Sequence, residues 1–166
     1  STHIPVGNLP NIGEQSITIM AANKTFNVAG LTSAFVIIPN KKQRLNFPRK
    51  AAGVVPWANH MGVLATEAAF TLCDDWYGAQ IKYLRDNRDF LTREINTIEG
   101  LSYQPAAATF LAWIDAGDLG VEDVQRYMLS KGLAPSAGSD FGWSNFTRFN
   151  FACPRKILEQ AITCLK

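Results

Sequence analysis

Two long helical patterns occupy the middle of this 166-residue chain. Within residues 57–98, apolar side chains recur every three or four positions, as they do on one face of an α-helix. The pattern predicts a helix over 57–73 with a buried face and a longer helix over 77–98, which Gly100 closes. Its apolar positions are Trp57, Met61, Leu64, Ala65, Ala68, Ala69, Leu72, Cys73, Tyr77, Ile81, Leu84, Leu91, Ile95 and Ile98.

Short apolar runs before and after these helices read as strands. The four strands are expected over 16–21, 34–39, 109–114 and 147–152. A further helix is expected over 121–131, closed by Gly132, and Pro154 stands where proline favours the first turn of a last helix. This alternation of helices and strands predicts a mixed fold, α/β at the start of the chain and α+β at its end.

The long second helix is the expected place of the domain boundary. We place that boundary near residues 77–87, which gives one unit over 1–76 and a small α+β domain over 77–166. Neither internal repeats nor low-complexity linkers interrupt the sequence.

Composition excludes several functional classes. The chain is 47% hydrophobic and 18% charged, which is typical of a globular protein. Its net charge of +2 predicts no nucleic-acid partner, and the basic runs 41–44 and 49–50 are expected on a solvated helix face. No apolar stretch approaches the ~20 residues that span a bilayer. Without a signal-peptide pattern, a cytoplasmic protein is expected.

The cysteines predict neither a disulfide framework nor a zinc site. They are three in number, Cys73, Cys153 and Cys164, and none stands in a CxxC pair. We therefore expect no bound metal, and a reducing compartment fits best.

Lys24 follows the first predicted strand and begins a turn of sequence Lys-Thr-Phe-Asn-Val-Ala-Gly-Leu. An isolated lysine is most often a solvated surface charge. A lysine that packing holds at a strand end and partly desolvates can instead present a neutral amine to an aldehyde. The residues alone leave both interpretations open.

Arg148 lies in the last predicted strand, in the segment Phe-Thr-Arg-Phe-Asn-Phe-Ala-Cys-Pro-Arg. Side chains alternate along a strand, so Arg148 and Asn150 share one face while Thr147 and Phe149 share the other. A guanidinium on a rigid strand can form two parallel hydrogen bonds with a carboxylate. The alternative is a structural salt bridge.

Four segments in order resemble the class I/II aminotransferase family, fold-type I enzymes dependent on pyridoxal 5′-phosphate (PLP), and especially its cystathionine β-lyase-like branch. Two are the Lys24 and Arg148 segments, the third is Pro105–Asp115, and the fourth joins His3-Ile4-Pro5 to Ser16-Ile17-Thr18. The resemblance covers nearly the whole chain but only the C-terminal half of such enzymes. It implies the end of the large PLP-binding domain over 1–76 and the complete small domain over 77–166.

The resemblance also implies roles for particular residues. Lys24 would bind PLP as a Schiff base and take the Cα proton of an amino-acid substrate, while Asn23 and Thr32 could hydrogen-bond its phosphate. Arg148 would hold the substrate carboxylate, whereas Arg155 is expected on the surface of the last helix. Many aminotransferases have an arginine at the position of Thr32, so Thr32 favours the β-lyase-like branch.

Several expectations concern the protein as a whole. The resemblance implies a homodimer acting on an amino acid, by transamination or by cleavage of a C–S bond. The 166 residues alone are expected to be inactive and to expose apolar surface where an N-terminal half would pack. The alternative is a non-catalytic, aminotransferase-like sensor or interaction module of a regulator. For His3 a catalytic role is not expected, and for His60 helix capping is preferred to catalysis.

Overall fold

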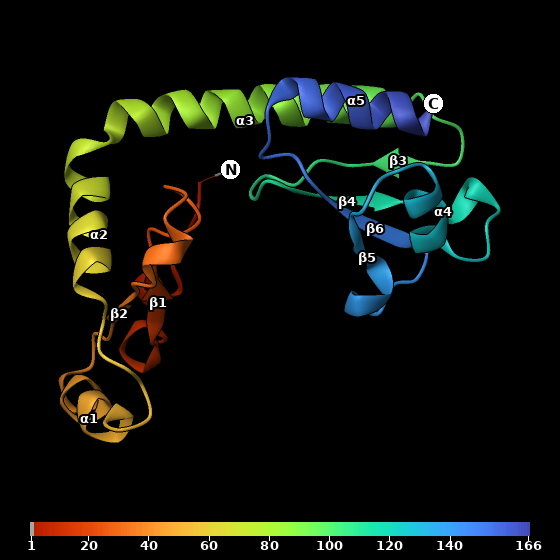
Figure 1. Cartoon of the computed structure of the whole chain (residues 1–166). Coiled ribbons are helices and arrows are strands. Elements are labelled where there is room, and N and C mark those ends of the chain that lie inside the picture. The colour runs from red at the N-terminus through yellow and green to blue at the C-terminus, as the bar shows by residue number, and fades with distance from the viewer. Residues whose placement is uncertain (1) are drawn as a thin grey trace. The chain divides into compact units, whose positions relative to one another are not determined.

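The computed structural model describes residues 2–166, which divide after Gly78 into two compact units. The elements of the first unit are coloured red to yellow in Figure 1. They are η1 (Val6–Asn8), η2 (Gly13–Gln15), β1 (Thr18–Met20), η3 (Ala29–Leu31), β2 (Phe35–Ile37), α1 (Lys41–Ala51), α2 (His60–Leu72) and the start of α3 (Asp74–Ile95). Strands β1 and β2 pair antiparallel, with Ile19 opposite Val36. The predicted strands are therefore present, though shorter than expected.

Asparagine side chains cap both short helices of this unit. The Asn40 side chain accepts a hydrogen bond from the backbone N–H of Gln43 at the start of α1. At the start of α2, Asn59 accepts from the N–H groups of Met61 and Gly62. Such side chains satisfy N–H groups that lack a partner within the helix. The cap predicted at His60 exists, but its acceptor is Asn59.

The first unit leaves much of its apolar surface exposed. The basic residues of α1 are solvated, as predicted. In α2, however, only Gly62 and Ala69 are buried, whereas Met61 and Leu72 are exposed. The buried face predicted for 57–73 is therefore wrong within residues 2–166, where these apolar side chains stay exposed. None of the helices in residues 2–166 is long and apolar enough to cross a membrane.

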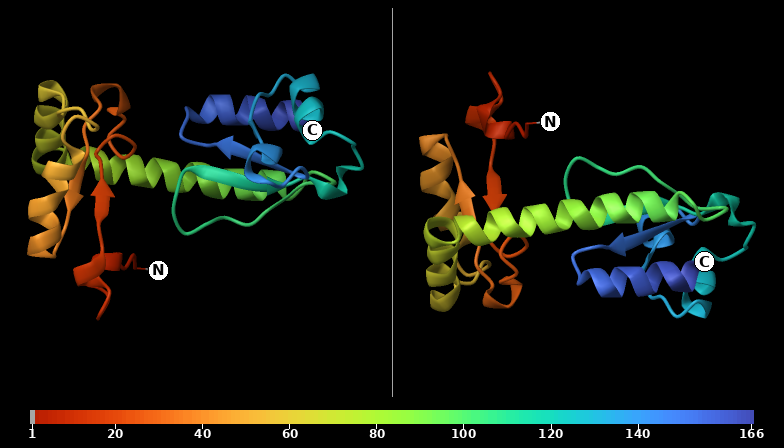
Figure 2. Two further views of the ribbon diagram at one scale, coloured as in Figure 1. Left: turned by 90° about the horizontal axis from the view of Figure 1, so that it is seen from below. Right: turned by 90° about the horizontal axis from the view of Figure 1, so that it is seen from above.

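The second unit contains a four-stranded antiparallel sheet in the order β3-β4-β6-β5. Its elements are the remainder of α3, β3 (Ser102–Tyr103), β4 (Leu111–Asp115), η4 (Gly117–Leu119), α4 (Val124–Ser130), β5 (Ser136–Ala137), η5 (Gly138–Phe141), β6 (Phe146–Asn150) and α5 (Arg155–Leu165). Figures 1 and 2 show α5 running beside the C-terminal half of α3. The predicted helices and central strands are present, and the two-residue strands β3 and β5 were not expected.

One face of this sheet forms the core of the second unit. Along β6, Thr147 and Phe149 are buried while Arg148 is half-buried and Asn150 is exposed, which confirms the predicted alternation. The core joins residues of all three helices to this face of the sheet: Leu91, Ile95, Leu101, Tyr103, Ala112, Ile114, Ala116, Val124, Met128, Phe149, Phe151, Leu158, Ile162 and Leu165. The opposite face is thereby left to Arg148 and its neighbours.

A buried asparagine fastens α5 to α3. Asn87, with no exposed surface, donates hydrogen bonds of 2.9 Å to the carbonyls of Phe151 and Cys153. Its Oδ1 accepts from Nε of Arg155 at 3.0 Å, and that guanidinium lies 4.4 Å from the ring centre of Phe90. Arg155 is therefore half-buried between two helices, and its expected place on the helix surface is wrong.

Replacing Asn87 by leucine should destabilise the second unit by about 2–4 kcal/mol. The change removes the hydrogen-bond partner of the Phe151 and Cys153 carbonyls, which precede α5, and of the Arg155 Nε–H at the start of α5. Urea unfolding of the full chain measures the loss. The matched control is Asp86→Leu, an exposed position in the same helix turn. Equal stability of the two variants would show that Asn87 does not fasten α5.

Candidate active site

Lys24 lies in a tight turn directly after β1, and its side chain is exposed. The turn is closed by backbone hydrogen bonds from Phe26 N–H to the Ala22 carbonyl at 2.9 Å and from Val28 N–H to the Asn23 carbonyl at 3.0 Å. Ala22 is fully buried. Within residues 2–166, the Lys24 amine has neither a salt bridge nor a side-chain hydrogen bond. The backbone of the turn is held in place while the amine stays free.

Phe26 anchors the far side of the same turn. Its ring packs edge-on against Phe70 of α2 at 5.6 Å between centroids and stacks on Trp76 of α3 at 5.9 Å. Such aromatic pairs stabilise beyond the area that they bury. With Ala22 buried on one side and Phe26 packed on the other, Lys24 is positioned by both of its flanks.

Gly62 brings α2 close to the end of this segment. A Cβ at Gly62 would lie 2.2 Å from the carbonyl oxygen of Leu31 and 2.9 Å from Cβ of Ser33. No side chain fits there, so glycine permits the helix to approach η3 directly. This close contact of α2 with Leu31 and Ser33 holds the backbone on both sides of Thr32. Thr32 itself is exposed and has a left-handed φ of 40°.

One segment thus carries Asn23, Lys24 and Thr32, and its backbone is held in place by the packing of neighbouring residues. Asn23 is half-buried, and both it and Thr32 offer neutral hydrogen-bonding side chains. Lys24 is the only charged residue between Ala21 and Ser33. The segment can therefore present one amine and several uncharged polar groups to a ligand.

Arg148 lies on β6 in the second unit. Its Nη2 donates a hydrogen bond of 3.0 Å to the Ser136 Oγ, and its Cζ lies 4.5 Å from the ring centre of Phe141. The Nε atom is buried and has no hydrogen-bond partner. A buried charged donor without an acceptor is costly, which sets this arginine apart from one held in a structural salt bridge.

The salt-bridge alternative for Arg148 does not match the structure. Among residues 2–166, the salt bridges join Arg88 to Asp89, Arg93 to Glu94 and Lys166 to Glu94. Arg148 has no carboxylate partner there. Its guanidinium is oriented by a hydroxyl and a ring, and it retains unpaired donors that could bind a carboxylate.

Sequence reasoning missed Ser136 and Phe141. Ser136 stands opposite Arg148 in the β5–β6 pair, but β5 is too short to give a periodic pattern. Phe141 belongs to η5 and also contacts Trp113 edge-on at 5.7 Å. Strand pairing places Ser136 beside the arginine, and the cation–π contact places Phe141 there.

The remaining candidates have weaker grounds for a catalytic role. His3 and His60 are exposed, and His60 begins α2. Burial raises the pKa of the Cys153 thiol, which keeps it protonated and a poor nucleophile near neutral pH. Within residues 2–166, no group of three His, Cys, Asp or Glu side chains could hold a metal ion.

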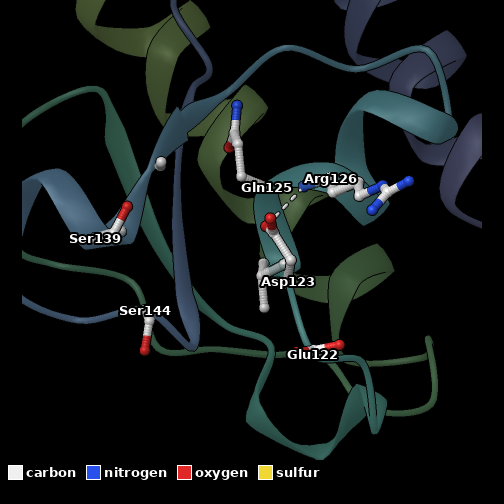
Figure 3. Close-up of a pocket in the computed structure, with 9 residues that line it drawn as sticks. Glu122, Asp123, Gln125, Arg126, Ser139 and Ser144 are labelled. Carbon is white, nitrogen blue, oxygen red and sulfur yellow. Dashed lines mark hydrogen bonds between the residues drawn. The ribbon is translucent and has the colours of Figure 1, made fainter.

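A separate pocket of about 450 Å³ lies at the start of α4 in the second unit. Figure 3 shows Asp123 accepting the N–H of Arg126 at its rim, with Ser139 and Ser144 on the opposite side. Asn23, Lys24, Thr32 and Arg148 are absent from its lining. The pocket is therefore distinct from both groups described above.

Relatives of this chain are cystathionine β-lyases and PLP-dependent aminotransferases. Cystathionine β-lyase PatB of Bacillus subtilis is 30% identical over 178 residues, which cover 99% of this chain and 44% of that protein. Protein MalY of Escherichia coli is 28% identical, over 98% of this chain and 43% of its own length. The chain thus spans less than half the length of these relatives. No protein-family model matches it.

Solved structures agree with the sequence relatives. The crystal structure of OvoB has a TM-score of 0.93 and 41% identity, covering 99% of this chain and 44% of its own. Other structural neighbours are PLP-dependent or PLP-bound enzymes. The fold is that of the C-terminal part of fold-type I PLP-dependent enzymes.

Proposed function

We propose that this chain, a homologue of the cystathionine β-lyases and PLP-dependent aminotransferases, supplies the cofactor lysine and the carboxylate-binding arginine of such an enzyme. Lys24 would be the lysine and Arg148 the arginine. The observation that carries the proposal is the Arg148 guanidinium, which is oriented by neighbours but has no carboxylate partner in residues 2–166. Since the relatives are more than twice as long, we call this chain together with a part that matches their N-terminal half the complete enzyme.

The residues of the first unit fit PLP as a ligand. An unpaired lysine amine on a fixed turn can form a covalent bond with an aldehyde. Asn23 and Thr32 would hydrogen-bond the phosphate group. Because Lys24 is the only cationic residue between Ala21 and Ser33, further phosphate contacts would come from outside this segment. The isolated 166 residues are accordingly expected to bind the cofactor weakly.

Bound PLP supplies an electron sink for the Cα–H bond of an amino acid. The amine of Lys24 would accept the Cα proton as a general base. Arg148 would hold the α-carboxylate by paired hydrogen bonds and so fix the orientation of the Cα–H bond. The substrate class that these residues recognise is an α-amino acid. As the resemblance implies, we expect a cytoplasmic homodimer.

Incubation of the complete, PLP-loaded enzyme with S-substituted cysteines tests the proposal. A C–S lyase converts each of them with water to pyruvate, ammonia and a thiol in equal amounts. An aminotransferase instead moves the amino group to an added 2-oxo acid and releases no thiol. Either result supports amino-acid chemistry at this site. If neither occurs over a panel of amino acids, the non-catalytic alternative, which the relatives do not favour, would be preferred.

A further inference from the structure

Arg148 lies on the sheet face that points away from the core of the second unit, and its neighbours on that face have no proposed role so far. Trp113 on β4 and Ser136 on β5 stand opposite Arg148 in the two strand pairs. Trp113 also stacks on Phe146 at 5.3 Å between centroids and meets Phe141 edge-on. The guanidinium therefore lies within a framework of hydroxyl and aromatic groups.

Phe141 is placed over the guanidinium by a close backbone approach. A Cβ at Gly138, the first residue of η5, would lie 2.2 Å from the carbonyl oxygens of Trp143 and Phe146. Glycine is required at this position, and it lets η5 turn tightly against β6. The turn then presents the Phe141 ring 4.5 Å from Cζ of Arg148, a favourable cation–π distance.

Ser136 fixes the guanidinium from the other side. Its Oγ accepts the hydrogen bond from Nη2 at 3.0 Å, and its own backbone is paired to β6 at Arg148 itself. Within residues 2–166, the Ser136 hydroxyl is the only hydrogen-bond acceptor of the Arg148 side chain. Arginine is a long, flexible side chain whose immobilisation on binding reduces affinity. A guanidinium that is already held avoids that loss.

We propose that Ser136 and Phe141 are positioning residues, which orient the Arg148 guanidinium for the α-carboxylate of the amino-acid substrate. The inference rests on the proposed function of Arg148 and adds how the affinity for the carboxylate is set. Ser136 acts through a directional hydrogen bond, and Phe141 restricts rotation by stacking. Neither residue touches the reacting atoms.

The test compares ligands that differ in the carboxylate alone. Calorimetry on the complete enzyme measures the dissociation constants of L-alanine and of ethylamine, which lacks the carboxylate. Ser136→Ala should weaken L-alanine binding about tenfold, since a hydrogen bond to a charged group is lost, and leave ethylamine binding unchanged. Ser136→Thr keeps the hydroxyl and should restore L-alanine binding. Ser130→Ala removes an exposed hydroxyl elsewhere in this unit and is the matched control.

Comparison with Arg148→Gln separates this inference from the proposed function. The carboxylate preference is the tighter binding of L-alanine than of ethylamine. Its loss in both Arg148→Gln and Ser136→Ala supports the positioning role of Ser136. Loss in Arg148→Gln alone would overturn the positioning role of Ser136 and leave the proposed function intact. If neither variant loses the preference, Arg148 is not the carboxylate site. Equal unfolding midpoints of the variants establish that folding is not the cause, and Phe141→Leu provides a second test of the orientation.

Discussion

The Lys24→Ala variant of the complete enzyme is expected to lose at least about 10²–10⁴-fold in kcat, because its general base is removed. The substitution also removes the amine that would bind PLP covalently. Lys24 is exposed in a turn held by Ala22 and Phe26, so the loss of its side chain should leave the fold unchanged. Initial rates with the amino acid that the wild type converts best measure the effect.

The control for this prediction is Lys42→Ala, an exposed lysine of α1 in the same unit. It should keep wild-type kcat, because its amine lies on a solvated helix face. Lys24→Arg keeps the charge but not the amine chemistry, and should be as inactive as Lys24→Ala. Near-normal turnover by Lys24→Ala would refute a catalytic role for this residue.

Arg148→Gln should reduce kcat/KM about 30- to 5000-fold, which corresponds to the roughly 2–5 kcal/mol for truncating one partner of a desolvated charge pair. Glutamine retains donors but not the charge or the planar fork. The effect should fall mainly on KM if Arg148 binds the ground state and the transition state equally. Steady-state kinetics of both variants and wild type provide the values.

The exposed arginine Arg126 provides the matched control for this second prediction. Arg126→Gln removes the same charge from the same unit and should leave kcat/KM unchanged. A similar loss in both variants would attribute the effect to net charge rather than to a carboxylate contact. Unaltered kinetics in Arg148→Gln would instead favour a structural role for that arginine.

Local patterns in the sequence predicted much of this fold. The alternation of Thr147 and Phe149 with Arg148 along β6 placed the arginine on the face away from the core, because side chains alternate on any strand. The three- and four-residue periodicity likewise predicted α2 and α3. The family resemblance, which depended on four ordered segments, is confirmed by the relatives.

Contacts between distant segments were beyond such reasoning. Arg155 was expected at the surface, yet Asn87, 68 residues earlier, binds its guanidinium within the α3–α5 contact. Ser136 lies in a two-residue strand that has no periodicity of its own. The periodicity of α2 predicted the helix but not the exposure of its apolar residues Met61 and Leu72, because burial depends on contacts between segments.

The most direct test of the account identifies the residue to which PLP is covalently attached in the complete enzyme. Reduction with borohydride makes the lysine–PLP bond permanent, and mass spectrometry of proteolytic peptides then locates it. We expect attachment at Lys24 and none in Lys24→Ala. Attachment at another lysine, or no attachment in the wild type, would contradict it.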